Sequence, residues 1–143
     1  MDAKTLIRHF SHSLGLGDIE PEADGTYEFC FDGNLVLHIF PEGRYTVLIH
    51  SPVCKIPNDD AHAAEQRIKH LMKLNLAKMG QQRELMTYDE QSREITMYRC
   101  LDVSNLNPDT FSEALEAYLN RLEAWIATPA QNDHRPPAMM LFP

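Results

Sequence analysis

The stretch TYEFCFDGNLVLHIF, residues 26–40, predicts a β-hairpin. Apolar side chains recur at every second position on both sides of Asp32 to Asn34, and an Asp-Gly pair is typical of a tight hairpin turn. The alternation places on one face the side chains of Tyr27, Phe29, Phe31, Leu35, Leu37 and Ile39. We therefore expect two antiparallel strands that bury one apolar face.

Three further strands follow the hairpin. Residues 45–50, YTVLIH, continue the alternation after a turn at 41–44. Pro52 and Pro57 are expected to end this strand, because proline has no backbone N–H and interrupts a sheet ladder. Residues 84–89 and 94–101 predict another strand pair, joined by the polar turn DEQSR.

Helix signals flank and separate these strands. Asp2 is the expected N-cap of the first helix, Asn58 to Asp60 offer a cap for the second, and Asn107 with Pro108 begins the third. Glycines 15 and 17 end the first helix, and Gly80 ends the second near Met79. The predicted buried face of the third helix consists of Phe111, Leu115, Tyr118, Leu122 and Trp125.

The element order is therefore α-β-β-β-α-β-β-α, which predicts an α+β fold of two layers with a five-stranded, mostly antiparallel sheet. We expect one domain over residues 1–128 and a Pro-rich flexible tail over 129–143. The face of the sheet away from the helices is also predicted to be apolar, and we assign to it Cys30, Val36, Phe40, Leu48, Met86 and Tyr88. Two apolar faces and only three helices indicate a dimer or a bound chain.

Composition excludes several classes of function. The chain has 143 residues and a formal net charge of −8, which argues against nucleic acid and anionic membrane surfaces as partners. Neither a signal peptide nor an apolar run of roughly 20 residues is visible, so we expect no membrane insertion. Three widely spaced cysteines favour free thiols in a reducing compartment.

Chemistry-bearing patterns are weak. There is no P-loop, GxGxxG or GxSxG motif, and no cofactor is expected. His9 with His12 and His62 with His70 lack further ligands at zinc-site spacing. Cys54 and His50 form a conceivable nucleophile and base, but no third group orients them. We therefore predict neither catalytic nor metal-binding residues, and we keep a small Cys/His or metal hydrolase as the less favoured alternative.

One polar residue interrupts the second helix. Its apolar stripe runs through Ala64, Ile68, Leu71, Met72, Asn75 and Met79. A buried amide is unfavourable by roughly 1–3 kcal/mol unless it is hydrogen-bonded. Asn75 therefore either bonds within its own chain or sits at the margin of the stripe, or it fixes the register of two helices at a subunit interface.

These features together resemble the class I type III secretion chaperones, a Tir-chaperone-like family. The resemblance covers about residues 1–127 and is carried by the strand pair FCFDGNLVLHI, the motif LMKLN at 71–75 and the run LNPDTFSEALEAYLNRLEAW. Within these motifs Leu71, Met72 and Asn75 match the central helix of the family, and Phe111 and Trp125 match its last helix.

The resemblance implies a homodimer in the bacterial cytoplasm that binds the N-terminal segment of one or more secreted effectors and keeps it extended, without enzymatic activity. It adds the secretion ATPase as a candidate partner. By analogy, the dimer interface is predicted to contain Leu71, Met72, Asn75, Ile95, Met97 and Tyr98.

An effector strand that adds to a sheet edge would place its apolar side chains in grooves between the first helix and the sheet. We predict that these grooves are lined by Leu6, Ile7, Phe10, Leu14, Leu16, Phe29, Phe31, Leu37 and Ile39. The main alternative is the same fold used outside secretion, as a regulator that binds a protein or ligand, and a chaperone that also captures a regulator of transcription stays open.

Overall fold

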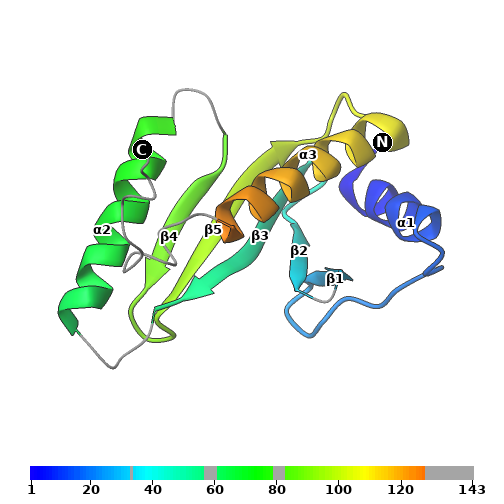
Figure 1. Ribbon diagram of the computed structural model, residues 1–143. Coiled ribbons are helices and arrows are strands. Elements are labelled where there is room, and N and C mark those ends of the chain that lie inside the picture. Colours follow the sequence, from blue (N-terminus) through cyan, green and yellow to red (C-terminus); the bar gives the residue numbers. More distant parts are fainter. Residues whose placement is uncertain (33, 57–60, 79–82, 128–143) are drawn as a thin grey trace.

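The structure is a computed structural model that describes residues 1–32, 34–56, 61–78 and 83–127 (Figure 1). Its elements are, in chain order, α1 (Ala3–Ser13), β1 (Tyr27–Phe31), β2 (Leu35–Pro41), β3 (Thr46–Lys55), α2 (Ala61–Lys78), β4 (Leu85–Asp89), β5 (Glu94–Asp102) and α3 (Pro108–Ile126). The predicted element order and the α+β fold class are confirmed.

All five strands form one antiparallel sheet in the order β1-β2-β3-β5-β4. The strands β1 and β4 are therefore its edges. In Figure 1, α3 crosses one face of the sheet, α1 lies at the β1 end, and α2 lies beside β4 at the opposite end. The two helices that flank the edges are thus far apart.

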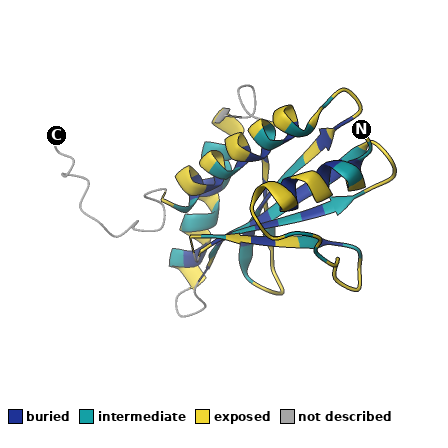
Figure 2. Ribbon diagram, turned by 90° about the vertical axis from the view of Figure 1, so that its right-hand side faces the viewer, coloured by how far each residue is buried: buried dark blue, intermediate teal, exposed yellow. Residues whose placement is uncertain are grey.

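The core lies between the sheet and the inner faces of α1 and α3, and Ala64 and Leu71 of α2 extend it. The outer faces of α1 and α3 are exposed (Figure 2). The predicted caps are confirmed at two helices: Asp2 accepts a hydrogen bond from the Thr5 N–H, and Asn107 and Thr110 form a reciprocal capping box. All residues of the predicted inner face of α3 are buried, namely Phe111, Leu115, Tyr118, Leu122 and Trp125.

Two predictions about the sheet are wrong. Pro52 does not end β3, which continues to Lys55 through an irregularity in the pairing between Pro52 and Cys54. Pairing with β2 stops at His38 opposite His50, so Pro52 lies where β3 is paired with β5, and the missing N–H is tolerated there.

The second correction concerns β4. Met86 is opposite Met97 and Tyr88 is opposite Ile95, so both point toward the helices rather than to the open face. Met86 is 5% exposed and belongs to the core. In their place, Leu85 shares the open face with its partner Tyr98.

Some predictions fall outside the described residues: those for Gly33 in the hairpin turn, Pro57, the cap at Asn58 to Asp60, Met79 and Gly80, and the tail at 129–143. Within the described part of the chain, no helix combines the length and the apolar character that a membrane span needs.

Candidate functional site

A groove opens where α1, the end of β1 and α3 meet. We call it the apolar groove; it has a volume of about 360 Å³ and is lined by Phe10, Ser13, Leu14, Phe31, Ser112, Glu116 and Leu119. Leu14 is 40% exposed although it is apolar, because α1 ends there and its side chain extends beyond the core. The groove therefore offers solvent-accessible apolar surface with one carboxylate at its rim.

Phe10 forms the floor of the apolar groove. Its ring packs edge-to-face against Phe29 at 5.1 Å and against Phe111 at 6.2 Å, and lies 6.5 Å from Phe31. With 7% of its surface exposed, Phe10 belongs to the core and the groove at once.

The structure divides the predicted groove residues into two groups. Phe10, Leu14 and Phe31 come together in the apolar groove. Leu6, Phe29, Leu37 and Ile39 are each 2% exposed or less in the single chain and form the core beneath the groove rather than its lining. The sequence pattern does not distinguish the two groups, because the same apolar periodicity marks residues inside the core and residues at its surface. Leu16 is 54% exposed beyond the end of α1.

Sequence reasoning missed the contribution of α3. Ser112, Glu116 and Leu119 lie at helical spacing beside the buried stripe, on the flank that faces α1. The available signal was Leu119, an apolar residue one position away from the stripe residue Tyr118.

A second groove lies on the other side of α1, at the beginning of β1. We call it the cationic groove; it has a volume of about 240 Å³ and is lined by Lys4, Ile7, Arg8, Asp18, Ile19 and Tyr27. A neighbouring hollow shares Lys4 and is completed by Asp2, Gly43 and Arg44. Of the predicted groove residues, Ile7 contributes here, although it is only 1% exposed.

The opposite end of the sheet carries the residues predicted for a dimer interface. On α2, Leu71 is 2% exposed, whereas Met72 and Asn75 are half-buried at the margin of the helix. Leu76 and Leu85 are 67% and 48% exposed, which is high for leucine. Ile95 and Met97 are fully buried within the single chain, so their side chains have no surface left for a partner; Tyr98 is half-buried on the open face.

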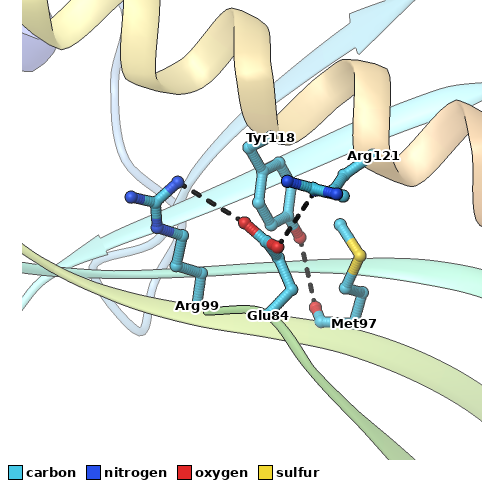
Figure 3. Close-up of polar contacts among 5 residues, drawn as sticks. All are labelled: Glu84, Met97, Arg99, Tyr118 and Arg121. Atoms are coloured by element: carbon cyan, nitrogen blue, oxygen red, sulfur yellow. Dashed lines mark hydrogen bonds and ion pairs between the residues drawn. The ribbon is translucent and has the colours of Figure 1, made fainter. Parts of the chain in front are cut away.

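A polar cluster around the buried Glu84, which directly precedes β4, links this position to β5 and α3 (Figure 3). The carboxylate of Glu84, 5% exposed, lies 3.4 Å from Arg99 Nη1 and 3.4 Å from Arg121 Nε. Beside it the Tyr118 hydroxyl donates to the Met97 carbonyl oxygen at 3.1 Å and lies 3.0 Å from Ser51 Oγ. Burial raises the pKa of Tyr118, which stays a neutral donor. These contacts fasten α3 to the sheet.

The geometry weighs against a Cys/His nucleophile. The ring of His50 stacks on His38 at 4.7 Å and also contacts Tyr98. Burial raises the pKa of the Cys54 thiol, which is opposite to the lowered pKa of an activated cysteine. Across the described ranges, no group of three or more His, Cys, Asp or Glu residues is arranged to hold a metal ion.

Comparison with known proteins identifies the class. The model of the Tir chaperone protein (CesT) family matches residues 5–126, so the chain belongs to this family and the resemblance seen in the sequence is confirmed. No curated protein matches the sequence at a significant level.

Solved structures share the fold. A chain of the HopA1–SchA chaperone–effector complex has a TM-score of 0.68 at 18% identity, over 87% of this chain and 93% of that one. A chain of the ExsC–ExsE complex has a TM-score of 0.63 at 17% identity, over 85% and 89%. The Yersinia pestis type III secretion chaperone SycH, in complex with a stable fragment of YscM2, gives 0.58 at 15% identity, over 85% and 97%.

Proposed function

We propose that this protein is a type III secretion chaperone of the bacterial cytoplasm, which binds the N-terminal segment of one or more effectors and keeps it extended until export. The observation that carries the proposal is the apolar groove, with Leu14 and Phe31 accessible beside the edge strand β1, in a chain of a chaperone family. The activity is binding alone, without a catalytic residue. The secretion ATPase stays a prediction of the family resemblance.

The edge strand β1 beside the apolar groove can bind an extended ligand. β1 pairs with β2 along one side, and its other side is an edge of the sheet that can accept main-chain hydrogen bonds from an added strand. Side chains of that strand that point toward the helices would enter the apolar groove. Burial of about 1,000 Å² of apolar surface, at about 25 cal/mol per Å², offsets the large entropy that an ordered segment loses.

The homodimer is the second part of the proposal. The α2–β4 end combines an edge strand with the exposed side chains of Leu76 and Leu85, next to the half-buried Met72, Asn75 and Tyr98. A second copy placed there would cover these groups, while the apolar groove at the other end stays accessible. Asn75 would then fix the register, and in Asn75→Leu we expect sedimentation to show a heterogeneous association state. An unchanged dimer would remove this role.

The binding proposal is tested by co-expression with the protein that the neighbouring reading frame encodes in the host. We expect a stable complex in which limited proteolysis leaves an N-terminal fragment of the partner protected. Leu119→Asp places a charge in the apolar groove and should abolish capture, with an unchanged circular dichroism spectrum. Ala117→Asp is the matched control, because Ala117 is exposed on the same helix outside the groove.

The two variants separate the possible outcomes. Loss of capture in Leu119→Asp alone supports the groove as the binding site. Equal capture by both variants places the site elsewhere, and a partner that is digested at the same rate with and without this protein contradicts the chaperone function.

A further inference from the structure

The apolar groove and the cationic groove lie along the same strand. Phe31, at the end of β1, lines the apolar groove, and Tyr27, at its beginning, lines the cationic groove. Both side chains point to the helix-covered face, because residues separated by an even number in a strand share a face. At about 3.4 Å per residue, four residues of an added strand span the separation between the two grooves.

The two grooves differ in charge. Glu116 is the charged residue among those that line the apolar groove. The cationic groove and its neighbouring hollow bring together Lys4, Arg8 and Arg44, in a chain whose net charge is −8. Together with the carboxylates of Asp18 and Asp2 in the same linings, these three cations leave a small local excess of positive charge, opposite to the overall sign of the protein.

Two carboxylates, Asp18 and Asp2, lie among these cations, and each makes a close contact with a group outside the groove. Asp18 lies 2.6 Å from His12 Nε2, and Asp2 accepts the hydrogen bond that caps α1. Among the described residues, Lys4 and Arg8 form no ion pair with either. The floor beside them is apolar, made by Ile7, Ile19 and Tyr27. This groove therefore fits a side chain that combines a short aliphatic stem with a negative charge.

From this difference in charge we infer which segments the protein binds, an inference that rests on the proposed function. The bound segment is extended and carries an apolar side chain that enters the apolar groove. Four residues away it carries an acidic side chain that pairs with Lys4 and Arg8. The pairing sets the direction of the segment along β1, because reversal would place the acidic side chain near Glu116.

The test uses two synthetic 16-residue peptides, with lengths chosen to exceed the roughly five residues of an average strand. Both carry one Leu in a background of Ser, Thr and Gln; one carries Glu four residues from the Leu, and the other carries Lys there. Fluorescence anisotropy at low ionic strength should show about fivefold tighter binding of the Glu peptide, since two exposed ion pairs contribute modestly.

Variants of the protein assign the difference to the groove. In Lys4→Glu with Arg8→Glu the preference should reverse. Lys69→Glu with Lys73→Glu, on exposed positions of α2, applies the same change of charge far from the groove and should keep the preference. In high salt the preference should shrink for the unchanged protein.

Failure of this inference differs from failure of the proposed function. If the two peptides bind equally, or neither binds, the charge rule is overturned, whereas capture of the partner and its loss in Leu119→Asp still support the chaperone. A preference that persists in the Lys4 and Arg8 variant also overturns the rule.

Discussion

The two ends of the sheet are built alike but completed differently. Each has an edge strand with a helix beside it: β1 with α1, and β4 with α2 (Figure 1). At the first end, α1 buries Ala3, Leu6, Ile7 and Phe10 within the single chain. At the second end, Leu76 and Leu85 stay exposed. Leu14 and Leu16 are exposed at the first end as well, but Leu14 there lines the apolar groove, whereas Leu76 and Leu85 lie outside both grooves described above.

This difference between the two ends corresponds to two kinds of binding, one in a preformed groove and one at an interface between subunits. A groove must keep its shape before the ligand arrives, so its floor is held by core residues such as Phe10. An interface between subunits needs no preformed hollow, because burial of apolar side chains on association provides its stability. The same sheet can therefore serve a ligand at one end and a second copy at the other.

Phe10→Ala should produce the largest effect. We expect the free energy of unfolding in urea to fall by about 4 kcal/mol, because the variant leaves a cavity among three aromatic rings at the packed end. Leu14→Ala, on the exposed side of the same groove, should change stability by less than about 1 kcal/mol. Similar losses in both variants would mean that the end of α1 is not rigidly anchored.

Glu84→Gln should cause the next largest loss of stability. Glu84 lies near the α2–β4 end, where ion pairs rather than aromatic contacts hold α3 against the sheet. Removing the buried carboxylate leaves Arg99, which is 13% exposed, without its counter-ion, and we expect a loss of about 3 kcal/mol. Arg121 is 44% exposed and contributes less, because solvent screens it. Glu113→Gln makes the same change at an exposed position of α3 and should be nearly neutral by urea denaturation.

Leu85→Arg tests whether the exposed end is an interface. The variant places a charge opposite Tyr98 on the edge of the open face, and we expect the dimer dissociation constant to rise about 30-fold in sedimentation velocity. Tyr45→Arg alters a side chain of comparable exposure, 40%, that lies outside the α2–β4 end, and should not shift the equilibrium. If both proteins sediment as the unchanged protein does, this end has another purpose.

The sequence alone predicts the packed parts of the fold better than their margins. The start of α3 follows from Asn107 and Pro108, since capping acts within one turn and needs no distant partner. The alternation alone predicts the wrong face for Met86 and Tyr88, because both alternating sets in β4 contain an apolar residue. Only the pairing with Met97 and Ile95 decides between the two sets.

The candidate site shows the same limit. Periodicity marks Phe10, Phe29 and Leu37 equally, yet Phe10 alone of the three reaches a groove, because the position of α3 decides what is covered. Contributions from Glu116 and Leu119 depend on how α3 crosses α1, which is a tertiary contact without a local signal.

The smallest expected effect is the pH dependence of stability that arises from His50, on the face of the sheet away from the helices. Burial, and then the charge of His38, lowers the pKa of His50 below 6.5, and Asp24 opposes this only weakly. Glu28 lies 3.8 Å from His38 Nδ1, and Tyr98 contacts the other side of His50. Because the folded chain binds a proton at His50 less readily than the unfolded chain, stability is complete above pH 6.5 and decreases as the pH falls below it.

We expect this loss to stay below about 1 kcal/mol, because His50 is only half-buried. His50→Phe retains a stacked ring that does not titrate, so the urea midpoint of this variant should decrease less between about pH 7.5 and pH 5.5 than that of the unchanged protein. His9→Phe, at an exposed position of α1, should follow the unchanged protein. Parallel curves for His50→Phe and the unchanged protein would show that the stacked pair takes up its proton as easily in the folded as in the unfolded chain.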